Sequence, residues 1–155
     1  MNEPPSSSEH REHIFALLKS FDTAMLVTHT EPDGLRARPM AMAAVEEEGL
    51  LWFVSSADTA KVHEIEVDTR VHLTCQREPA VYLSLSGFAT VVGDRKRLGE
   101  LWQEKFRAWF PDGKDDPEMV LIVVQLLECE FWDSKSIRNL KAFFGKKEQH
   151  GMVRL

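Results

Sequence analysis

Apolar residues follow two different periods along this chain, and the change of period separates the predicted helices from the predicted strands. Behind Ser8, a residue type that caps helix N-termini, apolar positions recur three and four residues apart as far as Lys19 and Ser20. The positions concerned are Ile14, Leu17, Leu18 and Phe21. This spacing predicts an N-terminal helix over residues 8–20, after a loose polar tail over residues 1–7.

Short strand-like runs make up most of the chain between residues 24 and 132. Turns are predicted between several of them, at Glu31–Gly34, 46–49 and 77–79, where Pro, Asp or Gly favour tight-turn backbone. The predicted strands cover residues 24–28, 35–45, 50–55, 71–76, 80–92, 119–127 and 130–132. With the last two runs taken as one strand or a strand pair, about six strands joined by short turns favour an antiparallel architecture.

Two more helices are predicted between the strands. Residues 59–67 form a short one, and Asp94 is suited to cap a longer one that stops at Pro111–Gly113. The apolar face of the longer helix carries Leu98, Leu101, Trp102, Phe106 and Trp109. All five are large apolar or aromatic residues at helical spacing, so this face is expected to belong to the core, and Trp109 with it.

The chain shows no internal repeat and no linker, so residues 8–135 are predicted to form one domain. Beyond Asp133 the sequence is polar, with a weak helical pattern over residues 137–144, and residues 136–155 are predicted to be a C-terminal polar segment. The predicted fold is mainly β with peripheral helices. A closed antiparallel barrel would leave no exposed sheet edge; an open α+β sheet covered by the same helices is the alternative.

Composition narrows the class of protein. The 155 residues are 43% hydrophobic and 28% charged, which is typical of one soluble globular domain. The net charge of -6 argues against broad nucleic-acid binding, which needs a basic face. No apolar stretch is long enough for a bilayer and no apolar signal core is present, so a cytoplasmic protein is expected. Cys75 and Cys129 lie in apolar runs and are expected to be buried free thiols.

Several common chemical motifs are absent from the sequence. It has no Gly-x-Gly-x-x-Gly fingerprint, no Walker loop and no Gly-x-Ser-x-Gly elbow, which are the usual signals of nucleotide-binding folds and hydrolases. The six histidines show no metal-ligand spacing with one another or with cysteine, and no metal site is predicted. A haem group would need an axial histidine, for which His29 and His72 are the candidates on predicted strands.

Cationic and hydroxyl side chains gather instead on neighbouring predicted strands. Arg36 and Arg38 alternate along one strand, so both point to the same face. The set continues, where the next strand gives way to a short helix, with Ser55, Ser56, Thr59 and Lys61. Helix N-termini, arginine, lysine and hydroxyl groups all bind phosphate, so this set predicts a site for one phosphate group. The alternative is a solvated strand face followed by ordinary turn and cap chemistry.

Two segments of this region resemble the FMN-binding segments of the pyridoxamine 5'-phosphate oxidase-like split barrels. They are Arg36-Ala37-Arg38-Pro39-Met40 and the run WFVSSADTAK from Trp52 to Lys61. The segments Trp109–Gly113 and Glu130–Asp133 are similar to the general stress protein 26 branch of the same superfamily. The resemblance spans about residues 10–135, with the motifs in the same order and at similar spacing.

The resemblance implies a six-stranded split barrel that forms a homodimer, with two FMN molecules at the subunit interface. Carried over by position, residues 36–40 would run along the flavin ring and ribityl chain, and Thr59 with Lys61 would hold the phosphate. The residues implied to contact FMN are Arg36, Arg38, Pro39, Met40, Val54, Ser55, Ser56, Thr59, Lys61, Ser86, Gly87 and Trp132.

Three functions are compatible with this resemblance. The first is an FMN-dependent oxidoreductase of unknown substrate that uses NAD(P)H or another electron donor. The second is a flavin-binding stress or sensor module without turnover, and the third is the same barrel holding haem or the deazaflavin F420. The chain reads Ser136–Lys141 where the true oxidase has an Arg-Leu-His-Asp-Arg stretch, so oxidation of pyridoxamine 5'-phosphate is not expected. No side chain is identified as a catalytic acid or base.

Overall fold

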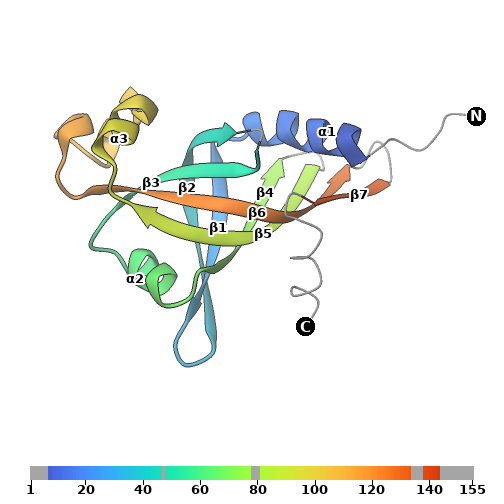
Figure 1. Ribbon diagram of the computed structural model, residues 1–155, viewed down its shortest axis with the longest axis horizontal. Helices are drawn as coiled ribbons and strands as arrows, with labels where there is room; N and C mark the ends of the chain where they lie inside the picture. The colour runs from blue at the N-terminus through green and yellow to red at the C-terminus, as the bar shows by residue number, and fades with distance from the viewer. Residues whose placement is uncertain (1–6, 47, 78–80, 134–137, 144–155) are drawn as a thin grey trace, which may run out of the picture.

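Antiparallel strands joined by short turns form most of the molecule, which is described from a computed structural model (Figure 1). The structure describes residues 7–46, 48–77, 81–133 and 138–143. Its strands are β1 (Thr23–Thr30), β2 (Gly34–Glu46), β3 (Leu50–Ser56), β4 (Arg70–Arg77), β5 (Val81–Val92), β6 (Met119–Asp133) and β7 (Arg138–Phe143). Its helices are α1 (Ser7–Lys19), α2 (Ala60–Val67) and α3 (Arg95–Leu101), and the 3₁₀ helices are η1 (Glu104–Ala108) and η2 (Gly113–Asp115).

The strands β1 to β6 close into a barrel. Their neighbours follow the order β3-β2-β1-β4-β5-β6, every pair is antiparallel, and β3 pairs with β6 to close the circle. β6 is long enough to pair with β3 along Met119–Gln125 and with β7 along Glu128–Asp133. The predicted six-stranded antiparallel barrel with peripheral helices is therefore confirmed, and the open sheet is not formed.

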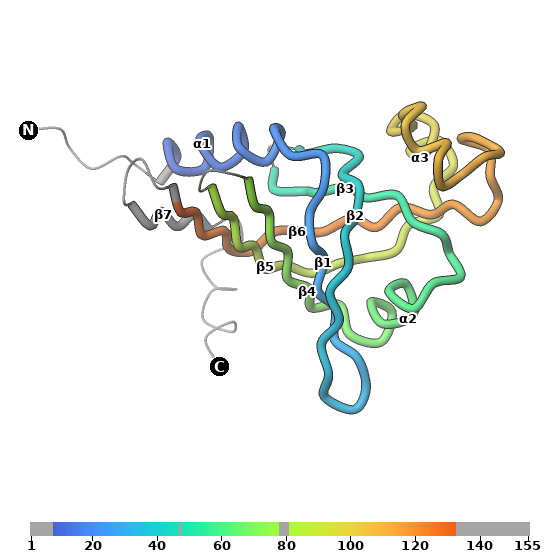
Figure 2. Tube along the Cα trace, turned by 180° about the vertical axis from the view of Figure 1, so that it is seen from behind, coloured from blue at the N-terminus to red at the C-terminus, as the bar shows by residue number. Residues whose placement is uncertain are grey.

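Inward-facing apolar side chains fill the barrel. In β1, Ala24 and Leu26 are buried while Thr23 and Met25 are exposed, as the alternation of a strand requires. Two helices add to this core from above and below the strands in the views of Figures 1 and 2. α1 contributes Ile14, Phe15 and Leu18, and α2 contributes Val62 and Ile65.

A second, smaller apolar cluster lies where α3 and η1 pack against β3 and β6. Its buried members are Val54, Leu98, Phe106, Phe110, Met119 and Leu121. Because Val54 neighbours the inward-facing Phe53 on β3, this strand has apolar residues on both faces. The second cluster thus fixes the loops after α3 against the end of β3, where the polar segment Ser55–Lys61 begins.

Two β-bulges interrupt the regular pairing. Ala43 is an extra residue in β2 opposite β3, and Leu127 is an extra residue in β6 opposite the step from Ser86 to Gly87 in β5. At the second bulge the backbones come close, because a Cβ atom on Gly87 would lie 2.3 Å from the carbonyl oxygen of Gln125. Glycine is therefore required at position 87 by packing.

The prediction of a helix over residues 137–144 is wrong for residues 138–143, the part of this range that the structure describes. Residues Arg138–Phe143 form strand β7, which pairs antiparallel with the second half of β6. A short polar segment gains backbone hydrogen bonds by adding to a strand edge, and this gain outweighs a weak helical pattern. By contrast, the runs 119–127 and 130–132 are one continuous strand, which was one of the two predicted possibilities.

The long helix predicted after Asp94 is correct only in its first half. The carboxylate of Asp94 accepts hydrogen bonds from the backbone N–H groups of Lys96 and Arg97, at 3.0 and 3.2 Å, and so caps α3. α3 ends at Leu101, and the chain re-enters a helical turn only at η1. At the other end of the chain, α1 begins at Ser7, one residue before the predicted cap.

Cys75 and Cys129 are buried and free, as predicted. Burial raises the pKa of each thiol to about 12, so neither is a ready nucleophile near neutral pH.

Within the described residues, the helices are too short or too polar to cross a lipid bilayer.

Candidate functional site

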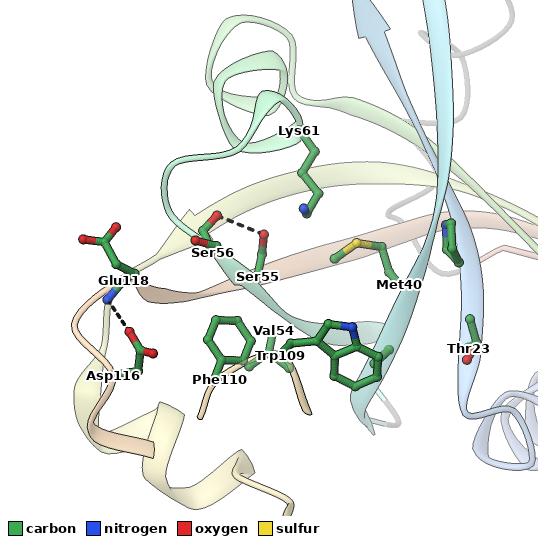
Figure 3. A pocket seen from close by; sticks show the side chains of 12 residues that line it. Thr23, Met40, Val54, Ser55, Ser56, Lys61, Trp109, Phe110, Asp116 and Glu118 are labelled. Carbon is green, nitrogen blue, oxygen red and sulfur yellow. Dashed lines mark hydrogen bonds between the residues drawn. The ribbon is translucent and has the colours of Figure 1, made fainter. Parts of the chain in front are cut away.

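A cavity of about 610 Å³ opens beside the end of β3, between β2 and the loop that follows η1 (Figure 3). Its size is within the range of small-molecule and cofactor sites. It is lined by Thr23, Pro39, Met40, Ala41, Val54, Ser55, Ser56, Lys61, Trp109, Phe110, Asp116 and Glu118. Six of these are residues that the sequence predicts as FMN contacts, namely Pro39, Met40, Val54, Ser55, Ser56 and Lys61.

Lys61 supplies positive charge to this cavity. It lies in the first turn of α2, and its side chain extends from the helix into the cavity toward Ser55 and Met40 (Figure 3). Within the described part of the chain, its ammonium group makes neither an ion pair nor a hydrogen bond. A half-buried cation without a protein partner is a group that an anionic ligand can complete.

The environment of Lys61 disfavours its charged form. Burial lowers the pKa of the ammonium group, the nearby charge of Arg38 lowers it further, and Glu64 partly offsets both effects. Arg38 acts on Lys61 because it pairs with Glu64, which lies one helical turn after Lys61 on α2. A bound phosphate would raise the pKa of Lys61 again, because its negative charge stabilises the ammonium form.

The N-terminus of α2 adds hydrogen-bond donors next to Lys61. Thr59 occupies the N-cap position with an extended backbone, but its side chain caps no N–H group of the helix. The Thr59 hydroxyl instead donates to the carbonyl oxygen of Ser56 at 3.0 Å, and the Ser55 hydroxyl donates to the same carbonyl at 3.1 Å. The first backbone N–H groups of α2 therefore have no cap side chain as acceptor, an arrangement that favours anions.

The two predicted arginines do not line the cavity. Arg38 is largely buried: it donates to the hydroxyl of Thr28 at 2.7 Å and pairs with Glu64 at 3.0 Å. Arg36 is mostly exposed, and its guanidinium lies 3.6 Å from the other oxygen of Glu64. Lys61 is thus unpaired, whereas both arginines already have a carboxylate partner. Thr59, for its part, supports the loop rather than the cavity wall.

An aromatic wall faces Lys61 across the cavity. Figure 3 shows Trp109 and Phe110 on the side of the cavity opposite the ammonium group. The side chain of Trp109 is 66% exposed, so its expected place in the core is wrong. The reason is the break after Leu101, which changes the helical phase so that Phe106 points into the second apolar cluster and Trp109 does not.

Three predicted FMN contacts lie elsewhere on the barrel. Ser86 and Gly87 are in the middle of β5, and Gly87 is explained by the close approach of β6. Trp132 is near the far end of β6, paired with Tyr82. Since β6 begins directly after the cavity residue Glu118, Trp132 is separated from the cavity by roughly 40 Å of strand.

Several cavity residues were not predicted from the sequence. They are Thr23, Ala41, Phe110, Asp116 and Glu118. Asp116 and Glu118 belong to the loop before β6, where Arg95 binds the backbone carbonyls of Asp116 and Pro117 at 2.7 and 2.8 Å. The segment Trp109–Gly113 was a signal for this loop, because it resembles a family motif, but its position beside β3 depends on the fold.

Among the residues that the structure describes, no histidine lines the cavity. His72 is half-buried on β4, with its Nε2 atom 2.9 Å from the Ser84 hydroxyl, and burial lowers its pKa. His29 lies on β1 and is not among the lining residues. In the described residues, no group of three His, Cys, Asp or Glu side chains is arranged to hold a metal ion.

The closed six-stranded antiparallel barrel, with a cavity lined by a lysine and aromatic residues at the end of β3, places this chain in the class of small β-barrel proteins with a ligand cavity. The chain belongs to the pyridoxamine 5'-phosphate oxidase-like family, whose model matches residues 9–151. The solved structures agree with this assignment. A Clostridium acetobutylicum protein related to general stress protein 26 superposes with a TM-score of 0.76, at 17% identity, covering 90% of this chain and 96% of that one.

Two further relatives have higher sequence identity. The general stress FMN/FAD-binding protein of Xanthomonas citri is 29% identical, with a TM-score of 0.70, over 81% of this chain and 89% of that protein. The protein bli-3 of Neurospora crassa is 27% identical over 129 residues, which cover 74% of this chain. The match spans only 62% of the length of bli-3.

Proposed function

We propose that this protein binds FMN in the cavity beside β3, with the flavin phosphate against Lys61 and the N-terminus of α2. The observation that carries this proposal is the unpaired, half-buried ammonium of Lys61 inside a cavity of cofactor size. The FMN/FAD-binding relative from Xanthomonas citri supports it. Within the described residues the cavity is lined by no histidine, which favours flavin over haem, because haem would need an axial ligand there.

The other lining residues fit the rest of a flavin. Pro39, Met40 and Val54 offer an apolar surface for a planar ring, and Trp109 offers an exposed aromatic face. The hydroxyls of Ser55 and Ser56 are placed between this surface and Lys61. A bound flavin would supply hydride or electron transfer, while these residues bind it, orient it and exclude water.

We also infer that the flavin site is completed by a second copy of the chain. Met25, Tyr82, Phe88 and Trp132 are each 38–41% exposed on the outer surface of the sheet, here called the outer apolar face. Tyr82 and Trp132 are direct cross-strand neighbours, and Met25 is paired with the cavity residue Pro39. The face therefore borders the cavity, and Trp132, which is far from the cavity in its own chain, could contribute to the site of a partner.

The first test is the identity of the bound ligand. Purified protein should be yellow, and denaturation should release a flavin that mass spectrometry identifies as FMN. Lys61→Met should weaken FMN binding by about 1.5–3 kcal/mol, or roughly 10- to 150-fold, because the phosphate loses a charged hydrogen-bond donor. Lys96→Met is the matched control, since Lys96 is exposed on α3 and outside the cavity, and should leave affinity unchanged.

A colourless protein that also fails to bind added FMN would contradict the proposal. Whether the bound flavin turns over is a separate question, because an oxidoreductase and a flavin-binding stress module would share the same cavity. Rapid bleaching of the flavin by NADH or NADPH would support an FMN-dependent oxidoreductase. Very slow reduction by both donors would support the binding module.

A further inference from the structure

Glu64 joins two parts of the molecule that are far apart in the sequence. It lies on α2, three residues after Lys61, and its carboxylate accepts a hydrogen bond from Thr28 on β1. The same carboxylate pairs with Arg38 at 3.0 Å and with Arg36 at 3.6 Å, both on β2. Glu64 therefore ties the helix that carries Lys61 to the hairpin formed by β1 and β2.

This network is shielded from water. Thr28 is fully buried, and the side chains of Arg38 and Glu64 are only 17% and 14% exposed. Arg38 also donates to the Thr28 hydroxyl, so the three groups form a closed set of mutual contacts. Hydrogen bonds in such a low-dielectric setting hold side chains in one arrangement more firmly than surface contacts do.

The network also acts on the charge state of Lys61, whose pKa is lowered most by burial. Burial alone would raise the pKa of Glu64, but the hydrogen bonds from Thr28 and Arg38 and the arginine charges lower it, so Glu64 is ionised at neutral pH. Its negative charge and the positive charge of Arg38 act on Lys61 in opposite directions. The positions of Arg38 and Glu64 therefore modify the charge state of Lys61, in addition to the larger effect of burial.

We propose that Glu64 is a positioning residue of the phosphate site: through Thr28 and Arg38 it ties the first turn of α2 to the β1–β2 hairpin, and so holds Lys61 where it meets a phosphate monoester. This inference rests on the proposed function of the cavity. A carboxylate that merely neutralised the arginines would oppose an anionic ligand, and its removal would then tighten binding. The two roles therefore predict opposite effects of the same substitution.

The test is a double-mutant cycle on FMN affinity, measured by the change in flavin fluorescence on binding. Glu64→Gln keeps the size and acceptor oxygen of the side chain and should weaken binding by about 3- to 10-fold. Arg38→Met should weaken it at least as much, and the double variant should be no weaker than Arg38→Met alone. Glu66→Gln is the control on the same helix, because Glu66 is 60% exposed and, among the described residues, its carboxylate approaches His63 alone, at 4.0 Å.

Tighter binding by Glu64→Gln, fully additive effects in the double variant, or an equal loss with Glu66→Gln would overturn the inference. A second measurement does not depend on flavin. In the ligand-free protein, NMR titration should show a lower pKa for Lys61 in Glu64→Gln and a higher one in Arg38→Met. A wild-type protein that binds no flavin would refute the proposed function, and a Lys61 titration that neither substitution changes would refute the role of Glu64.

Discussion

At the scale of single residues, the site depends on which cation has been left without a partner. The residue pattern alone places Arg36, Arg38 and Lys61 in one candidate phosphate site, and the resemblance assigns the phosphate to Lys61 with Thr59 and the flavin ring and ribityl chain to the two arginines. The structure separates them: both arginines pair with Glu64, and Lys61 does not. Nothing in the sequence identifies Glu64 as their partner, since the contact requires α2 to lie against the β1–β2 hairpin.

The lowered pKa of Lys61 leads to a prediction about pH. Phosphate binding needs the ammonium form of Lys61 and is strongest for the phosphate dianion, whose second pKa is about 6, so FMN affinity should be constant from about pH 7 up to the pKa of Lys61 in the free protein. It should fall as the pH rises through that value, which lies below the usual 10.5 of lysine. Fluorescence titrations of wild type and Lys61→Met over this range measure the effect. Ionisation of the flavin ring affects both proteins alike, so an identical pH profile in the two would contradict the role of Lys61.

The same residue affects the ligand-free protein in the opposite sense. The folded protein holds the proton on Lys61 less tightly than the unfolded chain does, so the unfolded state binds more protons between the lowered pKa and 10.5. The stability of the ligand-free protein therefore has a contribution from Lys61 that rises with pH in this window. A binding residue is thus maintained at some expense of stability.

At the scale of elements, the sequence predicts which segments are strands. It does not predict where a bulge switches the inward-facing positions of a strand from even-numbered to odd-numbered residues. Alternation in β2 brings Met40 and Met42 into the core, yet after the bulge at Ala43 it is Val45 that packs there. The helix after Asp94 gives a second example. Its N-cap can be predicted from the sequence, whereas the end of the helix at Leu101 cannot. Local patterns predict the existence of an element, while bulges and breaks depend on neighbours that lie far away in the sequence.

The close contact at the second bulge gives a prediction on stability. Gly87→Ala places a methyl group against the backbone oxygen of Gln125 and should lower the free energy of unfolding by about 1–3 kcal/mol. Gly99→Ala in α3 is the matched control, because no atom lies within 4 Å of the added methyl. It should raise stability by about 0.5–1 kcal/mol through helix propensity. Urea unfolding measures both, and equal effects would contradict the packing argument.

At the scale of the whole molecule, the cavity and the outer apolar face adjoin each other. The cavity alone accounts for half of the flavin contacts that the family resemblance implies, and Trp132 is at the other end of the barrel. A homodimer would bring the two ends together. Such a dimer could be predicted from the sequence only through resemblance, because the four residues of the face are scattered over three strands.

The outer apolar face gives the prediction at this scale. Sedimentation should show the wild-type protein at twice the mass of one chain. Met25→Asp introduces a charge into the face and should shift the protein to monomers with weaker FMN binding. Val67→Asp is the control, because Val67 is 70% exposed on α2 and outside the face. A Met25→Asp variant that stays dimeric and keeps its flavin affinity would exclude this face as the interface.

The extra residue at Leu127 changes which positions of β6 face the barrel interior. Before it, the even-numbered Val124 and Leu126 face inward; after it, the odd-numbered Cys129 and Phe131 do. A chain lacking residue 127 would show regular alternation of inward and outward residues, and its sequence pattern would predict a strand more clearly. It would also lose the bend by which β6 leaves β3 and continues toward β7. The most regular version of this strand would still close the barrel through β3, but it would lack the local bend that follows this pairing.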